Sequence, residues 1–425
     1  MSTLSSFHVM IVSNYFVTIK DFINLEFVCI KFRGNMNKFH FNPISLSYKT
    51  IKYFPNIETL HLYQKDDENF ENIIFVNTEN IGNNDVDEDN EYIDENEDDY
   101  YKYIEDTDGD DIIENNENNE NIDIKRNDED NNDNEDTSND EKDENFDVNK
   151  DTEIDKSDKN TINIQELNIN KQIVPTKMFY QIIVWFNVDY VTVDNNKGRK
   201  IMFKNVTYTK NNRQKFGNNI PFGVTSIGDQ CFKACKSLIN VTILSSVTSI
   251  GKGCFEVCSR LSSVDIPPSV SSMGESCFCG CSNLSYVTIP LNVTSLGDWS
   301  FYKCTSLRGV TIPSNVTSLG YNCFRECFSL SSVKIPLSVK LFGNNCFEEC
   351  IRLSRVTIPS NVTLINDHCF RECYNLSSVK IPSSVSSIGK SCFFNCSSLT
   401  SVTIPSNVTS LGVGCFPTYT VVNRE

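Results

Sequence analysis

Histidine is scarce in this sequence, and the common catalytic signatures are missing. Only four of the 425 residues are histidines, and they lie far apart in the chain. No P-loop, no G-x-S-x-G nucleophile elbow and no H-E-x-x-H zinc motif occurs. We therefore predict a protein that is not an enzyme and needs no cofactor. The four histidines are His8, His40, His61 and His368.

Long apolar runs and export signals are missing as well. A membrane-spanning helix needs about 20 apolar residues, and the apolar run at residues 181–188 is much shorter. The first 16 residues lack the basic start and continuous apolar core of a secretory signal. Residues 421–425 contain no lipidation motif. These absences predict a cytoplasmic protein without a membrane span, with unconventional export to the surface as the open alternative.

The dominant feature of the chain is a period of 23 residues in its second half. A Cys-Phe pair recurs eight times in register, and Ser300-Phe301 fills the one gap. A strict period of this length predicts a solenoid, in which each turn contacts only its neighbours. Solenoids present long surfaces, so we expect binding rather than catalysis. The pairs begin at Cys231, Cys254, Cys277, Cys323, Cys346, Cys369, Cys392 and Cys415.

One repeat, at residues 312–335, reads I-P-S-N-V-T-S-L-G-Y-N-C-F-R-E-C-F-S-L-S-S-V-K-I. Its closing S-V-K-I alternates apolar and polar residues, which predicts a β-strand, and residues 316–319 are a second extended candidate. Gly320 and its equivalents should turn the chain with a positive φ. Pro313 follows a strand and ends it, because proline donates no ladder hydrogen bond. We expect neighbouring repeats to pair their strands into one parallel sheet.

These residues resemble a known family. The pattern I-P-x-x-V-T-x-I/L-G-x-x-C-F-x-x-C-x-x-L is similar to the BspA-like leucine-rich repeats of bacterial and protozoan surface antigens, over roughly residues 220–416. The repeat pattern by itself predicts a stacked array of eight to nine 23-residue units. The resemblance implies a curved right-handed leucine-rich-repeat solenoid and a role as a surface or adhesion protein.

Sixteen of the 18 cysteines belong to the repeat, eight in the Cys-Phe pairs and eight standing four residues later. Three interpretations are open: buried packing columns, a disulfide framework, or a metal array. We favour buried columns, because free cysteine behaves as a small apolar residue. Equivalent side chains in a stack also point the same way, which does not suit disulfide geometry, and the C-x3-C spacing differs from zinc motifs. Reduced thiols predict a reducing compartment.

The repeat also predicts which side chains form columns. The residue after each Cys-Phe pair is charged in three consecutive repeats, so Arg325, Glu348 and Arg371 should form an alternating ladder on the outer surface. An all-negative column should stand one residue later. The phenylalanines should stack through the core as one column that includes Phe255, Phe278, Phe301, Phe324, Phe347, Phe370 and Phe393.

The first 84 residues lie outside the repeat. Two amphipathic stretches, residues 9–16 and 21–32, predict helices, with Asp21 capping the second, and residues 57–62 predict a strand. The helical segment resembles an F-box, which implies docking of an Skp-type ubiquitin-ligase adaptor through residues 1–40. The alternative is a helical cap for the solenoid. The positions that match the F-box are Ile11, Tyr15, Phe16, Asp21, Phe22, Leu25, Val28, Cys29 and Phe32.

Residues 85–158 are strongly acidic. They contain 34 Asp and Glu against six Lys and Arg, a net charge of −28 in a chain of −18, so the remainder carries +10. High like charge and low hydrophobicity predict disorder. Such a run either stays a solvated loop or binds basic partners or Ca²⁺ weakly. We divide the chain into a helical or F-box-like segment (1–84), a disordered acidic insertion (85–175), joining strands (176–219) and the solenoid (220–425).

We expect the strand face of the solenoid to bind a protein, and we expect no nucleic-acid partner. Side chains that alternate with the buried Val and Ile of each strand point outward, and most of them are Ser or Thr. Lys334, Arg355 and Lys380 cluster on three adjacent repeats, which predicts an acidic or phosphorylated partner surface. Tyr286 and Asp265 are further candidate contacts at outward positions.

Overall fold

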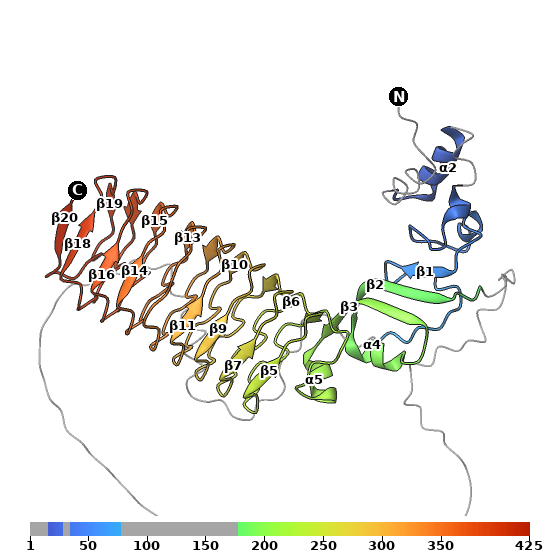
Figure 1. The fold of residues 1–425 in the computed structure, drawn as a ribbon, viewed down its shortest axis with the longest axis horizontal. Coiled ribbons are helices and arrows are strands. Elements are labelled where there is room, and N and C mark those ends of the chain that lie inside the picture. The colour runs from blue at the N-terminus through green and yellow to red at the C-terminus, as the bar shows by residue number, and fades with distance from the viewer. Residues whose placement is uncertain (1–15, 29–34, 78–176) are drawn as a thin grey trace, which may run out of the picture. The chain divides into compact units, whose positions relative to one another are not determined.

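The computed structural model describes residues 16–28, 35–77 and 177–425 (Figure 1). They belong to one compact unit, which residues 1–83 and 174–425 form together. The helix expected at residues 9–16 and the disorder expected for residues 85–158 lie outside the described part of the chain.

The N-terminal segment contains a helix where one is expected, but Asp21 does not cap it in the expected way. Helix α2 spans Ile19–Val28, so Asp21 lies in its first turn. The Asp21 carboxylate accepts hydrogen bonds from the backbone N–H and the hydroxyl of Thr18, at 2.9 and 2.8 Å. It thus holds the residue ahead of the helix, as an acidic side chain at the third helical position does. Two short 3-10 helices follow, η2 (Met36–Lys38) and η3 (Ile51–Tyr53).

Phenylalanine rings attach this segment to the rest of the fold. The ring of Phe22 on α2 meets Phe39 and Phe54 edge to face, at centroid distances of 5.8 and 5.4 Å. All three side chains are buried, and the edge-to-face arrangement is the one that aromatic quadrupoles favour. The helix is therefore packed against the chain that leads into the first strand.

One parallel sheet combines strands from both sides of the acidic insertion in the sequence. Strand β1 (Thr59–Leu62) precedes the insertion and β2 (Gln181–Asp189) follows it, yet the two pair directly. Strand β3 (Ile201–Tyr208) pairs with β2, and the short helices α4 (Tyr190–Asn195) and α5 (Lys210–Phe216) follow these strands. The sheet continues into the repeats in the order β1-β2-β3-β4-β6-β8. The insertion thus interrupts one sheet.

The residues that flank the insertion are hydrogen-bonded to this sheet. The Asn77 side chain donates to the buried carboxylate of Asp189 (2.7 Å), and its backbone N–H donates to the Thr192 hydroxyl (2.9 Å). On the other flank, the Lys177 carbonyl accepts from the Asn72 side chain (3.2 Å). The chain therefore leaves and re-enters the fold at fixed points.

Each repeat contributes strands to two parallel ladders, which we call the first and the second ladder (Figure 1). The first ladder continues from β3 in two-residue strands, each in register with a neighbour 23 residues away, as Ser226 is with Ser249. Its strands are β4 (Ser226–Ile227), β6 (Ser249–Ile250), β8 (Ser272–Met273), β10 (Ser295–Leu296), β12 (Ser318–Leu319), β13 (Leu341–Phe342), β15 (Leu364–Ile365), β17 (Ser387–Ile388) and β19 (Ser410–Leu411).

The second ladder uses the closing strand of each repeat. The strand expected at residues 332–335 is reduced to a single bridge, between Thr311 and Lys334. Its regular strands are β5 (Asn240–Thr242), β7 (Ser263–Asp265), β9 (Tyr286–Thr288), β11 (Gly309–Thr311), β14 (Arg355–Thr357), β16 (Ser378–Lys380), β18 (Ser401–Ile404) and β20 (Val421–Arg424).

The solenoid is thus confirmed, but it is longer than expected and has two ladders rather than one sheet. About 11 turns are present instead of eight to nine, because β2 and β3 already stack as turns ahead of residue 220. The extended candidate at residues 316–319 supplies the first ladder, and the closing strand supplies the second.

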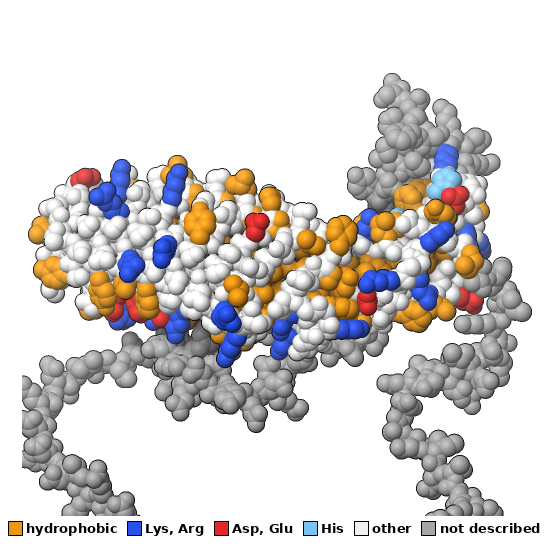
Figure 2. Space-filling view, turned by 60° about the horizontal axis from the view of Figure 1, so that its bottom comes forward, with side chains coloured by type: hydrophobic (Ala, Val, Ile, Leu, Met, Phe, Trp, Pro, Cys, Tyr) orange, Lys and Arg blue, Asp and Glu red, His pale blue; other side chains and the backbone are white. Residues whose placement is uncertain are grey.

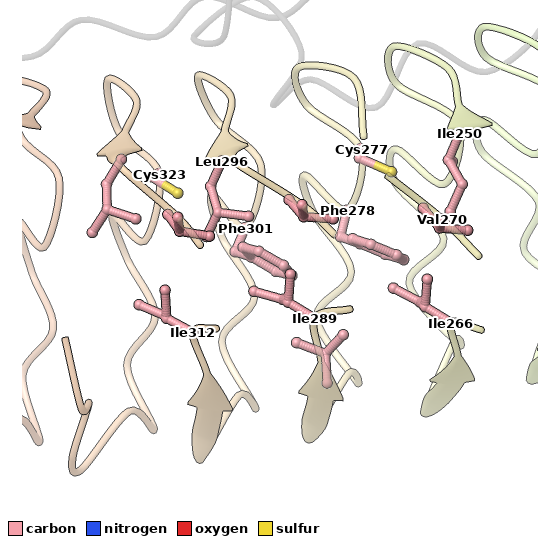
Figure 3. Packing of buried hydrophobic residues seen from close by; sticks show 14 of the residues in the cluster. Ile250, Ile266, Val270, Cys277, Phe278, Ile289, Leu296, Phe301, Ile312 and Cys323 are labelled. Atoms are coloured by element: carbon pink, nitrogen blue, oxygen red, sulfur yellow. The ribbon is translucent and has the colours of Figure 1, made fainter. Parts of the chain in front are cut away.

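A column of parallel phenylalanine rings runs between the ladders, as predicted. Consecutive rings from Phe232 to Phe416 are 5.2 to 5.6 Å apart between centroids and are inclined by 15° or less. Figure 3 shows Phe278 and Phe301 between the apolar side chains of the first ladder and the isoleucines that follow the second-ladder strands. All but Phe416, at the end of the column, are fully buried.

The cysteines are buried beside this column, which confirms the packing interpretation. All 17 cysteines in the described residues are buried, and none of these 17 forms a disulfide. The second cysteine of a repeat has a further task, because its thiol donates a hydrogen bond to the phenylalanine carbonyl of the preceding turn. The distance from Cys327 Sγ to the Phe301 oxygen is 3.2 Å. Burial raises the pKa of Cys327 well above its ordinary value, so the thiol keeps the proton that it donates.

The repeated glycines do not turn the chain with a positive φ, so that expectation was wrong. At Gly251 a Cβ atom would stand 2.5 Å from the backbone nitrogen of Asp229 in the preceding turn. Glycine is required there because two backbones approach too closely for a side chain. The left-handed residues are instead those before each cysteine, such as Asn322 (φ 52°) and Glu326 (φ 58°).

Replacing Phe347 by Ala should lower the free energy of unfolding by about 3–5 kcal/mol, because it opens a cavity between two stacked rings. The matched control is Ser332→Ala, an exposed substitution outside the ring column, which should change stability by less than about 0.5 kcal/mol. Urea unfolding followed by circular dichroism measures both. Equal midpoints for the two variants would show that the ring column does not hold the turns together.

Candidate binding surface

The outward positions of the second ladder are those that the alternation of apolar and polar residues in each closing strand predicts. In β14 the side chain of Val356 is buried, whereas Arg355 and Thr357 on either side of it are exposed. The same exposed-buried-exposed pattern occurs in β5, β7 and β9. In Figure 2 much of the solenoid surface is white, the colour of the backbone and of side chains that are neither hydrophobic nor charged. A basic side chain therefore stands out on a mostly hydroxylated face.

Lys334, Arg355 and Lys380 form what we call the basic patch. Lys334 bridges to Thr311 and Lys380 pairs with Thr357, so both lysines share one outward column. Strands about 4.8 Å apart place the two lysines roughly 10 Å from each other, and Arg355 lies on the strand between them. All three are exposed, and none forms an ion pair with another described residue. The structure thus brings these three residues together.

Tyr286 and Asp265 do not join the basic patch. Tyr286 lies three turns before Arg355 in one outward column, and Asp265 lies three turns before Lys334 in the other. Three turns correspond to roughly 14 Å at sheet spacing. Tyr286 is 54 % exposed, and its hydroxyl lies 3.0 Å from the hydroxyl of Thr311. Its ring extends over Gly309, where a Cβ would be 3.7 Å from the ring edge. Tyr286 is therefore an exposed aromatic side chain apart from the basic patch.

Arg325, Glu348 and Arg371 form the alternating charge ladder that the repeat predicted. The Glu348 carboxylate forms an ion pair with Arg325, with Nε 3.1 Å from Oε2, and accepts a hydrogen bond from Arg371 Nη1 at 3.3 Å. The same arginines also reach the all-negative column, Arg325 meeting Glu349 at 3.6 Å and Arg371 meeting Glu372 at 3.1 Å. These ion pairs offset the repulsion between the carboxylates of that column.

The position of this ladder on the outer surface was predicted wrongly for its central residue. Glu348 is only 3 % exposed, and burial raises the pKa of its carboxyl to about 7 although two guanidinium groups oppose the shift. The equivalent positions in earlier turns hold Cys279 and Tyr302, which are also buried. Those two residue types at the same phase were the signal in the sequence that this column faces inward.

The unfolding free energy should depend on pH through Glu348. Because the folded pKa, about 7, lies above the ordinary 4.5, the folded state binds the proton more tightly. The stability from this group is complete below pH 4.5 and is lost as the pH rises through 7, by roughly 3–4 kcal/mol. Glu348→Gln should remove that loss.

The difference in unfolding free energy between the wild type and Glu348→Gln, measured from pH 4.5 to 8.5, isolates this term. This difference separates the contribution of Glu348 from those of His368 and Glu349. The lowered pKa of His368 makes the unfolding free energy rise with pH, and the pKa of Glu349 is raised like that of Glu348. Glu275→Gln, which removes an exposed, ion-paired carboxylate three turns from Glu348, is the matched control and should follow the wild-type profile. A difference that stays constant with pH would contradict the raised pKa.

Two parallel ladders around a stacked aromatic column define a β-solenoid of the leucine-rich-repeat class. The family model described as "BspA type Leucine rich repeat region (6 copies)" matches residues 202–331 and 317–423, which together make up just over half of the chain. The chain therefore belongs to the BspA-type leucine-rich repeat family.

Solved structures of bacterial leucine-rich repeat proteins are similar to this chain. One from Bacteroides ovatus is 26 % identical, with a TM-score of 0.37, over 53 % of this chain and 67 % of the other. The T. pallidum leucine-rich repeat protein is 26 % identical, with a TM-score of 0.31, over 46 % and 78 %. A leucine-rich cell surface protein from Faecalibacterium prausnitzii is 24 % identical, with a TM-score of 0.26, over 56 % and 82 %.

Two further findings concern curated relatives and membrane-spanning helices. Among curated proteins, no sequence matches this chain. Among the helices in the described ranges, none combines the length and the apolar character needed to cross a membrane.

Proposed function

We propose that this chain is a protein-interaction module that binds an acidic or phosphorylated partner surface through the basic patch. The observation that carries the proposal is the grouping of Lys334, Arg355 and Lys380 on neighbouring turns, exposed and without carboxylate partners among the described residues. Hydroxyl side chains surround them and offer further hydrogen-bond donors to carboxylate or phosphate oxygens. Repeat solenoids commonly use such extended faces for binding.

The triple variant Lys334→Ala, Arg355→Ala, Lys380→Ala tests this proposal. The probe is a glutamate-rich peptide that contains phosphoserine, measured by fluorescence anisotropy at low salt. We expect the triple variant to bind at least tenfold more weakly, because each exposed charge contact contributes up to about 1 kcal/mol and three are lost. Unchanged affinity would count against the basic patch.

A matched control removes three other exposed basic residues, by Lys236→Ala, Arg260→Ala and Lys390→Ala. This variant has the same net charge as the triple variant but keeps the basic patch. It should bind the phosphoserine peptide nearly as well as the wild type. If both variants lose affinity equally, the attraction comes from net charge and not from the patch.

Docking of an Skp-type adaptor through residues 1–40 stays a prediction. The family match lies outside this segment. Phe22, one of the F-box positions, packs in the core against Phe39 and Phe54. Deleting the segment would therefore damage the fold. Reversing exposed polarity on α2, by Lys20→Glu and Asn24→Arg, is the cleaner test. Copurification of an Skp-type protein that survives these changes, or never occurs, would remove this alternative.

A surface-antigen role and a cytoplasmic location also stay predictions. Free, buried cysteines throughout the solenoid favour a reducing compartment. The family resemblance favours surface display. Labelling of intact cells with a membrane-impermeant reagent separates the two, because only a displayed protein would be labelled.

A further inference from the structure

The outward side chains of the first ladder change character at its N-terminal end. In the repeats these positions are mostly serine, as at Ser249, Ser272 and Ser295. On β1, β2 and β3 several outward positions carry aromatic or aliphatic side chains instead, alongside polar ones such as Asn187 and Lys204. The register places His61 of β1, Ile183 of β2 and Met202 of β3 in one row across the sheet.

Aromatic contacts join this row to its neighbours. The His61 ring stacks on Phe41 with centroids 4.7 Å apart, and it lies 5.9 Å from Trp185. The Tyr63 and Trp185 rings are nearly parallel, inclined by 14° at 6.4 Å. We call this continuous surface the aromatic platform, and it consists of Phe41, His61, Tyr63, Ile183, Trp185 and Met202.

Hydrogen bonds fix the Tyr63 side chain and the backbone of His61 within the platform. The Tyr63 hydroxyl donates to the Asn42 carbonyl at 2.9 Å and lies 3.2 Å from His61 Nδ1. The buried Asn42 side chain in turn bonds both the N–H and the carbonyl of His61, at 2.6 and 2.7 Å. A surface that is already ordered loses little side-chain entropy when a partner binds, which favours affinity.

The platform is open to solvent and carries positive charge. Trp185 is 39 % and Met202 is 41 % exposed. Lys204 Nζ lies 5.7 Å from the centroid of the Trp185 ring, and the lysine has no ion pair among the described residues. The nearby carboxylate of Asp67 is occupied by the backbone N–H groups of Tyr63 and Gln64, at 2.6 and 3.0 Å. A ligand therefore meets a largely apolar surface beside Lys204, which forms no ion pair in the described part of the chain.

We propose that the aromatic platform docks a peptide segment of a partner protein, with an apolar or aromatic anchor residue against the exposed part of Trp185 and Met202 and an Asp or Glu beside it that reaches Lys204. Trp, Tyr and Met are enriched at the centres of protein interfaces. The aliphatic side chains of Ile183 and Met202 offer no hydrogen bonds, so they suit a peptide side chain better than a sugar. The site lies on the first-ladder side, separate from the basic patch on the second.

An array of synthetic peptides tests this, with Trp, Phe, Leu or Ser at the centre and Asp, Ser or Lys on either side. The full-length protein should bind Trp- or Phe-centred peptides with Asp flanks at least tenfold more tightly than the same peptides with Lys flanks. Trp185→Ala should abolish this binding. Lys204→Glu should reverse the flank preference while anchor binding persists.

Controls keep the outcome clear. Lys390→Glu reverses an exposed charge far from the platform and should leave the flank preference unchanged, and thermal melts confirm that each variant folds. The basic-patch triple variant should bind these peptides like the wild type, so failure of one site is separable from failure of the other. An unaltered flank preference in Lys204→Glu, or binding to a glycan array but to no peptide, would overturn the proposal.

Discussion

Every turn of this solenoid depends on hydrogen bonds from the next turn. Between the two ladders, the Phe324 N–H donates to the Cys346 carbonyl at 2.8 Å, and the Glu326 N–H donates to the Glu348 carbonyl at 2.9 Å. A single turn would leave these buried groups unsatisfied, which is costly. The thiol of the second cysteine supplies a further bond to the Phe carbonyl, and at Gly251 and most of its equivalents the neighbouring backbones approach too closely for a side chain.

This stacking makes each column of equivalent side chains a surface of its own. Residues 23 positions apart lie about 4.8 Å apart in space, so a short change of composition in one column creates a local site. Serine and threonine columns form a neutral background, and three basic residues on it make a patch. The stacking of equivalent positions has the same effect inside the solenoid. The carboxylate of Glu348 is buried there between arginines on both neighbouring turns.

The N-terminal strands extend this principle beyond the visible repeat. β1 and β2 lie on opposite sides of the acidic insertion, yet their backbones pair in the same parallel register as the repeats. Because Asn77 and Lys177 are hydrogen-bonded to that sheet or to the segment beside it, the insertion need not disturb it. The outcome is one structure with two candidate binding surfaces, one on each ladder.

The period of 23 residues by itself determined the solenoid, the phenylalanine column, the burial of the cysteines and the outward positions of Lys334, Arg355 and Lys380, because each follows from equivalence between neighbouring turns. Only the tertiary structure decided the rest. The glycine requirement comes from a close approach between backbones, and the raised pKa of Glu348 comes from burial, neither of which a pattern of residue types records. The aromatic platform joins Tyr63 to Trp185 across the insertion, and side chains so far apart in the chain become neighbours only when β1 and β2 pair.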